Sequence, residues 1–171
     1  MSTSTDSKHS KGRSDGHSDG HQNGAREFHD TSIRVRYAET DQMGVVYHSN
    51  FYIWFEIGRV ELFRNLGFAY KDMEQKDDCF IVVAESKCRH ARPARYDEVL
   101  RIRTRISEVR TRTIRFEYEV VNDATKESLA TGETFHVICG KDGRPKPLPA
   151  HYRKLFGVDD PVHSAHERPK S

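Results

Sequence analysis

The stretch from Tyr37 to His48 combines residue types that can attack an acyl group and stabilise the charge that develops on it. It reads Tyr-Ala-Glu-Thr-Asp-Gln-Met-Gly-Val-Val-Tyr-His, and it places Asp41 in a polar loop just before an apolar helical pattern. Gly44 allows a positive φ or a close backbone approach. The start of a helix offers unpaired N–H donors to an anion or a developing oxyanion. A carboxylate beside such donors suits acyl transfer, although Asp41 could equally be a loop or capping residue.

The elements that position this stretch follow from the hydrophobic periodicity. Alternation over 32–37 predicts a strand, and the pattern over 51–66 predicts a long helix. We expect Asn50 to be its N-cap and Gly67 its C′ residue. The first half of this helix is apolar nearly all round, which predicts burial.

Four further strands are predicted over 80–84, 100–106, 114–120 and 129–139, followed by a short helix around 151–156. The continuous apolar run at 80–84 favours a strand covered on both faces. The order predicts an α+β fold, in which an antiparallel five-stranded sheet is wrapped around one long central helix. Because such a sheet covers its helix on one side only, we expect an oligomer.

The composition separates one domain from two tails. The chain has 171 residues, of which 35% are hydrophobic, and a mean hydropathy of -0.81. Residues 1–30 and 157–171 nearly lack apolar side chains, so we predict a disordered N-terminal tail, a domain over 31–156 and a flexible C-terminal tail. Histidines in the first tail are better explained by solvation than by a metal site.

Several classes of protein are excluded at this point. No apolar run is long enough for an integral membrane segment, and the N-terminus lacks the apolar region of a secretory signal. The cysteines at 79, 88 and 139 have neither disulfide-scaffold nor zinc-site spacing, which predicts a reduced, cytoplasmic location.

The motif itself resembles a known family. The run Y-A-E-T-D-Q-M-G-V-V-Y-H-S-N-F-Y-I-W-F-E is similar to the signature of hotdog-fold acyl-CoA thioesterases of the 4-hydroxybenzoyl-CoA thioesterase type, especially the YbgC-like branch. The resemblance extends over roughly 32–156 and includes D-E-V-L after the Arg-rich turn. It implies hydrolysis of acyl-CoA to a free acid and CoA with no metal or organic cofactor, by a homodimer or homotetramer.

The resemblance also implies roles for individual residues. Asp41 matches the catalytic aspartate, which attacks the thioester or activates water. His48 matches the position at the helix start whose backbone N–H polarises the carbonyl, and its side chain is a further catalytic candidate. Tyr37 matches a tyrosine four residues before the aspartate, although it could equally be a core aromatic. The candidates for substrate binding at the loop and helix start are Gly44, Val45, Tyr47 and Phe51.

A basic segment between residues 86 and 115 carries a local net charge of +7. The alternating arginines at 101, 103 and 105 are typical of a solvated strand face. Lys87, Arg89, Arg92 and Arg95 cluster instead at a strand end and a proline turn, where one or two of them could bind the phosphates of coenzyme A. The same patch would serve an acyl-carrier protein. A nucleic-acid partner lacks supporting motifs.

Three alternatives follow from the remaining residues. Glu56 and Glu61 lie on the helix, where a buried carboxylate needs a partner that Arg59 or Arg64 could provide. Glu56 is interpreted as structural support, although a helix carboxylate is the catalyst in other hotdog branches. A noncatalytic acyl-CoA-binding or sensing module would share the same fold and pocket. A hydratase would need a His–Glu pair in place of the Asp41 motif, and the sequence has no such pair at a corresponding position.

Overall fold

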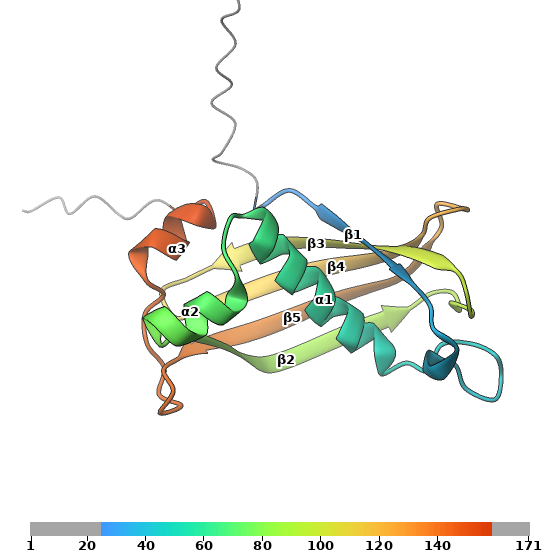
Figure 1. The fold of residues 1–171 in the computed structure, drawn as a ribbon, viewed down its shortest axis with the longest axis horizontal. Helices are drawn as coiled ribbons and strands as arrows, with labels where there is room; N and C mark the ends of the chain where they lie inside the picture. Colours follow the sequence, from blue (N-terminus) through green and yellow to red (C-terminus); the bar gives the residue numbers. More distant parts are fainter. Residues whose placement is uncertain (1–24, 159–171) are drawn as a thin grey trace, which may run out of the picture.

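One long helix crosses one face of a five-stranded antiparallel sheet in the computed structural model, which describes residues 25–158 (Figure 1). The strands are β1 (His29–Arg34), β2 (Phe80–His90), β3 (Val99–Val109), β4 (Thr113–Asn122) and β5 (Ser128–Cys139), in the order β1-β3-β4-β5-β2. The long helix is α1 (Asn50–Asn65), and the shorter helices are α2 (Tyr70–Asp77), α3 (Ala150–Leu155) and the 3-10 turn η1 (Tyr37–Glu39). The predicted α+β hotdog architecture is confirmed.

The predicted tails fall largely outside the described residues, since 1–24 and 159–171 are not described. Within the described residues, β1 begins at His29, two residues before the expected start of the domain. Ala25 is buried, and its carbonyl accepts a hydrogen bond from the N–H of Ile106 at 2.9 Å.

The N-cap of α1 lies one residue before the predicted one, and the helix ends where expected. Ser49 is the N-cap, so the prediction for Asn50 is wrong: the amide of Asn50 donates to two backbone carbonyls instead of accepting from the first turn. At the other end, Gly67 has a φ of +92°, and the N–H of Phe68 donates to the carbonyl of Phe63, which is the expected left-handed C-terminal closure.

Close contact at two glycines holds α1 against the sheet. A Cβ at Gly58 would lie 2.3 Å from Thr104 Oγ1 on β3, and one at Gly132 on β5 would lie 2.3 Å from the ring of Phe55. Phe55 in turn stacks on Tyr118 with ring centroids 4.2 Å apart. The absence of side chains at these two positions therefore sets the distance between helix and sheet.

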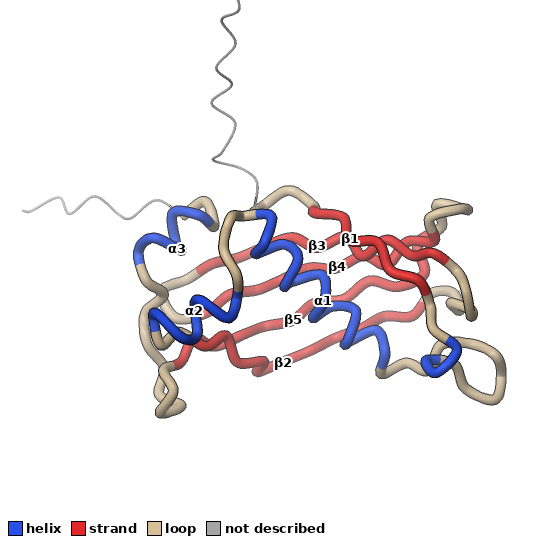
Figure 2. The backbone as a smooth tube through the Cα atoms, viewed as in Figure 1, coloured by secondary structure: helices blue, strands red, loops and turns tan. Residues whose placement is uncertain are grey.

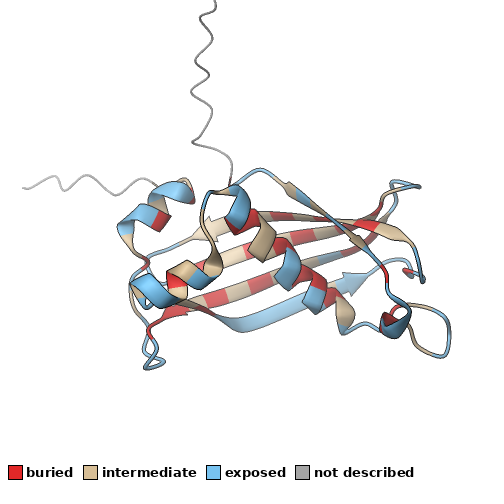
Figure 3. Cartoon of the chain, in the orientation of Figure 1, coloured by how far each residue is buried: buried red, intermediate tan, exposed pale blue. Residues whose placement is uncertain are grey.

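The sheet covers α1 on one side only, as expected, and ends in two edge strands, β1 and β2. We call the edge at β2 the open edge, because β2 is the more exposed of the two. Residues 82–87 of β2 are exposed, and Figure 3 shows this strand in pale blue beside the buried positions of β3, β4 and β5. The prediction that 80–84 is covered on both faces is wrong, because β2 is an edge strand that pairs only with β5. On α1, Tyr52, Ile53 and Ile57 are also exposed, so the helix is not buried all round.

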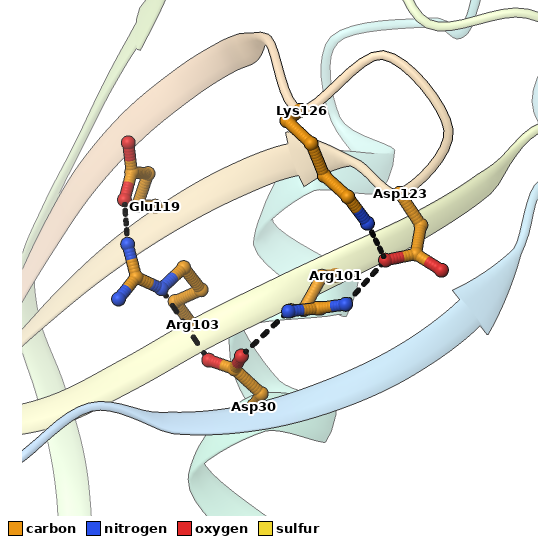
Figure 4. A network of polar contacts seen from close by, with 6 residues as sticks. All are labelled: Asp30, Arg101, Arg103, Glu119, Asp123 and Lys126. Carbon is orange, nitrogen blue, oxygen red and sulfur yellow. Dashed lines mark hydrogen bonds and ion pairs between the residues drawn. The ribbon is translucent and has the colours of Figure 1, made fainter.

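The outer face of the sheet carries paired charges. Arg103 on β3 contacts Glu119 on β4 at 2.8 Å, and Asp30 on β1 contacts both Arg101 and Arg103 (Figure 4). Arg101 also pairs with Asp123, which extends the network to Lys126. Arginines and acids of neighbouring strands therefore pair across this face.

Replacement of Gly58 by alanine tests the close contact. In a helix without tertiary contacts, alanine is more favourable than glycine by about 1 kcal/mol. Here the added Cβ would clash with Thr104 Oγ1, so we expect Gly58→Ala to lower the free energy of unfolding by about 1–3 kcal/mol. Thr104→Ala should restore most of it in the double variant, since it removes an oxygen that has no hydrogen-bond partner in the described chain. Urea unfolding measures both effects, and a stabilised Gly58→Ala single variant would contradict this account.

Candidate active site

Asp41 lies in a small hairpin just before α1. Thr40 and Val46 form its closing bridge, and the N–H of Asp41 donates to the carbonyl of Val45 at 2.9 Å. Gly44 completes the turn with a φ of +71° and donates its N–H to the Asp41 carbonyl. Asp41 Oδ1 accepts the N–H of Met43 at 2.8 Å, which is a local Asx turn. The other carboxylate oxygen has no hydrogen-bond partner within residues 25–158, so it is available for chemistry.

A buried carboxylate two residues earlier holds this hairpin in place. Glu39 is 4% exposed, and it accepts the Arg36 N–H at 2.7 Å, the Arg36 guanidinium at 2.9 Å and the indole N–H of Trp54 at 3.2 Å. Burial opposes the charged form, but these donors outweigh it and hold the pKa of Glu39 below its usual value. Glu39 is therefore an anionic anchor between the hairpin and the core face of α1.

The backbone carbonyl of the same residue fixes the start of α1. It accepts the N–H of Tyr47 at 2.9 Å and the side-chain amide of Asn50 at 2.9 Å. The N–H groups of His48 and Ser49, which lie between them, donate to no acceptor in the described part of the chain. Two free backbone donors therefore stand at the helix start, beside the hairpin that carries Asp41.

A cavity of about 310 Å³ opens beside this helix start. Its walls come from the hairpin, from α1 and from the end of β2 with the loop that follows, and it includes Val45, His48, Phe51, His90 and Arg92. Figure 2 shows this end of the molecule opposite the end that carries α2 and α3. Three predicted substrate-binding residues and His48 are thus brought together here, while Asp41 lies on the adjoining hairpin.

His90 also lines this cavity, although the sequence alone did not identify it as a candidate site residue. Its ring meets Phe51 edge-on at 4.6 Å, and its Nδ1 lies 3.8 Å from Cys88 Sγ. Partial burial, with the nearby His48 as a second cause, lowers the pKa of His90. A neutral imidazole is therefore favoured there. No local spacing links His90 to the Asp41 motif; the pairing of β2 with β5 and the turn after it bring it in.

Two predicted aromatic residues lie on the surface near the hairpin. Tyr37 is 77% exposed and meets Tyr96 edge-on at 5.7 Å, so it is not a core aromatic. Tyr47 is also exposed and packs against the ring of His48 at 4.3 Å.

The predicted basic cluster is divided by the sheet. Arg92 lines the cavity and pairs with Glu127 at 3.3 Å. Lys87 and Arg89 line a different hollow with Phe28 and the outer-face glutamates, and Lys87 contacts Glu133 at 3.6 Å. Lys87 and Arg89 lie two residues apart on β2 and so share one face of the strand, whereas Arg92 lies in the loop that follows it.

One of the two helix carboxylates pairs as expected, since Arg64 binds Glu61. Glu56 is exposed and has no ion pair within residues 25–158, while Arg59 donates to the hydroxyl of Tyr118 at 3.1 Å. The three cysteines are free, and burial raises the pKa of both Cys79 and Cys88 to about 11, which favours unreactive thiols.

Within the described range, no group of three His, Cys, Asp or Glu side chains could hold a metal ion, and no helix is long and apolar enough to cross a membrane.

Comparison with known proteins gives consistent matches. The model of the thioesterase-like superfamily matches residues 35–156. YneP of Bacillus subtilis is 36% identical over 138 residues, which is 81% of this chain and 94% of YneP. The acyl-CoA thioesterase YbgC of Haemophilus influenzae is 33% identical over 116 residues, which is 68% of this chain and 83% of YbgC.

The fold also matches a solved structure. The 4-hydroxybenzoyl-CoA thioesterase of Pseudomonas sp. strain CBS-3 superposes with a TM-score of 0.70 over 75% of this chain and 99% of that one. Its sequence is only 20% identical, so this match supports the fold alone.

The Glu39 anchor predicts a pH-dependent stability. Glu39→Gln should lower the free energy of unfolding by about 1–3 kcal/mol near neutral pH, because charge-assisted hydrogen bonds are lost. The folded-state pKa lies below the unfolded one, so this contribution is complete above the ordinary glutamic acid pKa of about 4.3 and is lost as the pH falls below it.

Glu98→Gln is the matched control, because Glu98 accepts the N–H of Arg95 in the same three-residue arrangement in an exposed loop. Denaturant unfolding of the wild type and both variants from neutral to acidic pH gives the comparison. The account would be contradicted if both variants lost the same free energy of unfolding, or if the loss in Glu39→Gln persisted in acid. Either result would show that the buried charge of Glu39 contributes no additional stability.

Proposed function

Because the chain belongs to the thioesterase-like superfamily and is an acyl-CoA thioester hydrolase, we propose that it cleaves its substrate with the carboxylate of Asp41. The observation that carries this proposal is the free Asp41 oxygen on a hairpin that Glu39 ties to the start of α1. The products are a carboxylic acid and CoA. Water supplies the hydroxyl of the acid and the proton of the thiol.

Two routes fit the position of Asp41. As a nucleophile, the carboxylate attacks the carbonyl carbon, CoA leaves as a thiolate that takes a proton, and water hydrolyses the resulting acyl anhydride. As a general base, the carboxylate removes a proton from the water that attacks the carbonyl directly. The substrate oxygen gains negative charge in both routes, and the free N–H groups of His48 and Ser49 are suitable donors to it.

The neighbouring residues support distinct parts of this reaction. The cavity beside Phe51 and Val45 would exclude water from the acyl group near the thioester. Arg92 is the member of the predicted basic cluster that lines the same cavity, and it is therefore our candidate to contact the CoA phosphates. Lys87 and Arg89 could reach only a part of CoA, or of an acyl-carrier protein, that extends over the edge of the sheet.

The open edge of the sheet supports a homodimer. Val82 and Val83 on β2 are 50% and 49% exposed, and the neighbouring face of α1 exposes Tyr52, Ile53 and Ile57. Pairing of β2 with the same strand of a second copy would satisfy the unpaired backbone groups of this edge and cover the apolar side chains. The homotetramer of the sequence-based prediction would need a second contact surface.

Replacement of Asp41 by asparagine tests the assigned chemistry. We expect CoA release to fall by about 10²–10⁴-fold, because the amide is neither a nucleophile nor a base. A thiol-release assay over a panel of acyl-CoA esters measures the loss, and thermal unfolding checks that the fold is retained.

Asp142→Asn is a matched control, since Asp142 also accepts the N–H of the residue two positions later, in an exposed turn. It should leave turnover unchanged. Wild-type rates in Asp41→Asn would remove Asp41 from the mechanism, and tight binding by the wild type with no CoA release would favour the noncatalytic module.

Replacement of Val83 by lysine tests the dimer. A charged side chain on the open edge should weaken self-association, so light scattering after size-exclusion chromatography should show a monomer at concentrations where the wild type is dimeric. Leu155→Lys on α3 places the same charge at another exposed apolar position and should leave the dimer intact. An unchanged mass for Val83→Lys would contradict pairing through β2.

A further inference from the structure

A second recess continues along α1, away from the Asp41 hairpin. It consists of two adjoining hollows of about 240 and 100 Å³ between α1 and β2, and Glu56 and Arg59 line both of them. The larger hollow has apolar walls that include Tyr52, Ile53 and Val83. We call the two hollows together the α1–β2 groove.

Arg59 brings an unpaired positive charge into this groove. Its side chain is partly buried, donates to the hydroxyl of Tyr118 at 3.1 Å and lies 6.0 Å from the ring centre of Phe116. No carboxylate lies within 4.0 Å of it in the described chain, and it is the only cation among the residues that line the groove. A guanidinium has five N–H donors in a planar fork, so most of its binding capacity is unused.

A buried polar chain fixes the position of this guanidinium. The Tyr118 hydroxyl accepts from Arg59 and lies 2.7 Å from Thr134 Oγ1, which in turn lies 2.7 Å from Nε2 of His136. Burial, with the charge of Arg59 as a second cause, lowers the pKa of His136 to about 4, so the imidazole is neutral near pH 7. Each hydroxyl can then donate to the next group, which leaves the Tyr118 oxygen oriented to accept from Arg59.

We propose that the α1–β2 groove binds an acyl group that ends in a carboxylate, which Arg59 holds by charge-assisted hydrogen bonds. This inference rests on the proposed function and defines its substrate class. A partly buried cation without a counterion favours an anionic ligand, and the fork of Arg matches a carboxylate in two-point contact. The apolar walls suit the methylene chain before it.

The position of Arg59 on α1 sets the length of this acyl group. Arg59 is eleven residues beyond His48, which corresponds to about 16 Å along the helix axis. A thioester carbonyl at the helix start and a carboxylate at Arg59 are therefore the two ends of an extended, medium-length dicarboxylic chain. Short acyl groups would not reach.

Glu56 is the group that opposes this ligand. It lies about one helical turn nearer to the start of α1, but it is exposed, so water screens its charge more than that of Arg59. Glu56→Gln should therefore tighten the binding of a carboxylate-ended acyl group and have less effect on an uncharged one.

A matched pair of substrates tests the proposal: decanoyl-CoA and the CoA monothioester of decanedioic acid, which differ only in the distal carboxylate. The wild type should prefer the latter in kcat/KM. Arg59→Leu should reduce that preference by about 10–100-fold, the range expected for hydrogen bonds to a charged group, and Arg59→Lys should reduce it less. Arg64→Leu, on the exposed side of the same helix, should leave the preference unchanged.

Binding measurements separate this proposal from the proposed function. Calorimetry with Asp41→Asn, and with Asp41→Asn combined with Arg59→Leu, gives the dissociation constants of both CoA esters without turnover. A preference for the carboxylate-ended ester that Arg59→Leu removes supports the groove even when the assigned chemistry fails. A wild-type preference for decanoyl-CoA, an equal loss for both esters, or a change of oligomeric state in Arg59→Leu would overturn it.

Discussion

The buried carboxylate of Glu39 is the interaction on which the position of the site depends. Its side chain holds the backbone and guanidinium of Arg36 and the indole of Trp54, while its own carbonyl holds the N–H of Tyr47 and the amide of Asn50. One residue therefore connects the segment between β1 and the hairpin, the core face of α1 and the backbone at the start of α1. The role that we propose for Asp41, which lies on a loop, needs such support, because a displacement of about 1 Å lowers catalytic rates strongly.

The distance between α1 and the sheet determines what the rest of the surface can do. Gly58 and Gly132 allow the helix to lie close to β3 and β5, so little space remains on that side. The hollows that we propose for the acyl group, and the surface that we propose for a second copy, lie on the β2 side of α1. Tyr52, Ile53 and Val83 belong both to the proposed groove and to the proposed subunit contact, so we expect changes in one to affect the other.

The sequence predicted the parts of the fold that repeat regularly. Alternation located β3 and β4 and predicted β1 three residues too late, apolar runs located β2 and β5, and the apolar pattern with Gly67 located α1. Burial of 80–84 was predicted wrongly, because an apolar run does not show whether a strand lies at an edge. Helix α2 was not predicted, because Met73 is its only buried residue and its sequence therefore has no apolar periodicity. In the site, Asp41 and His48 lie in one local motif, whereas His90 comes from strand pairing and a turn that local spacing does not encode.

Charge pairing reduces the net charge that the basic segment 86–115 presents to an anionic ligand. The local net charge of +7 includes Arg103 and Arg105, which glutamates on β4 neutralise across the outer face. Such pairs contribute about 0–1 kcal/mol each to stability, but they also weaken the field that a phosphate would experience. Arg59, outside the counted segment and without a carboxylate partner in the described chain, keeps its charge available. Position relative to acids, more than the number of cations, therefore determines where an anion binds.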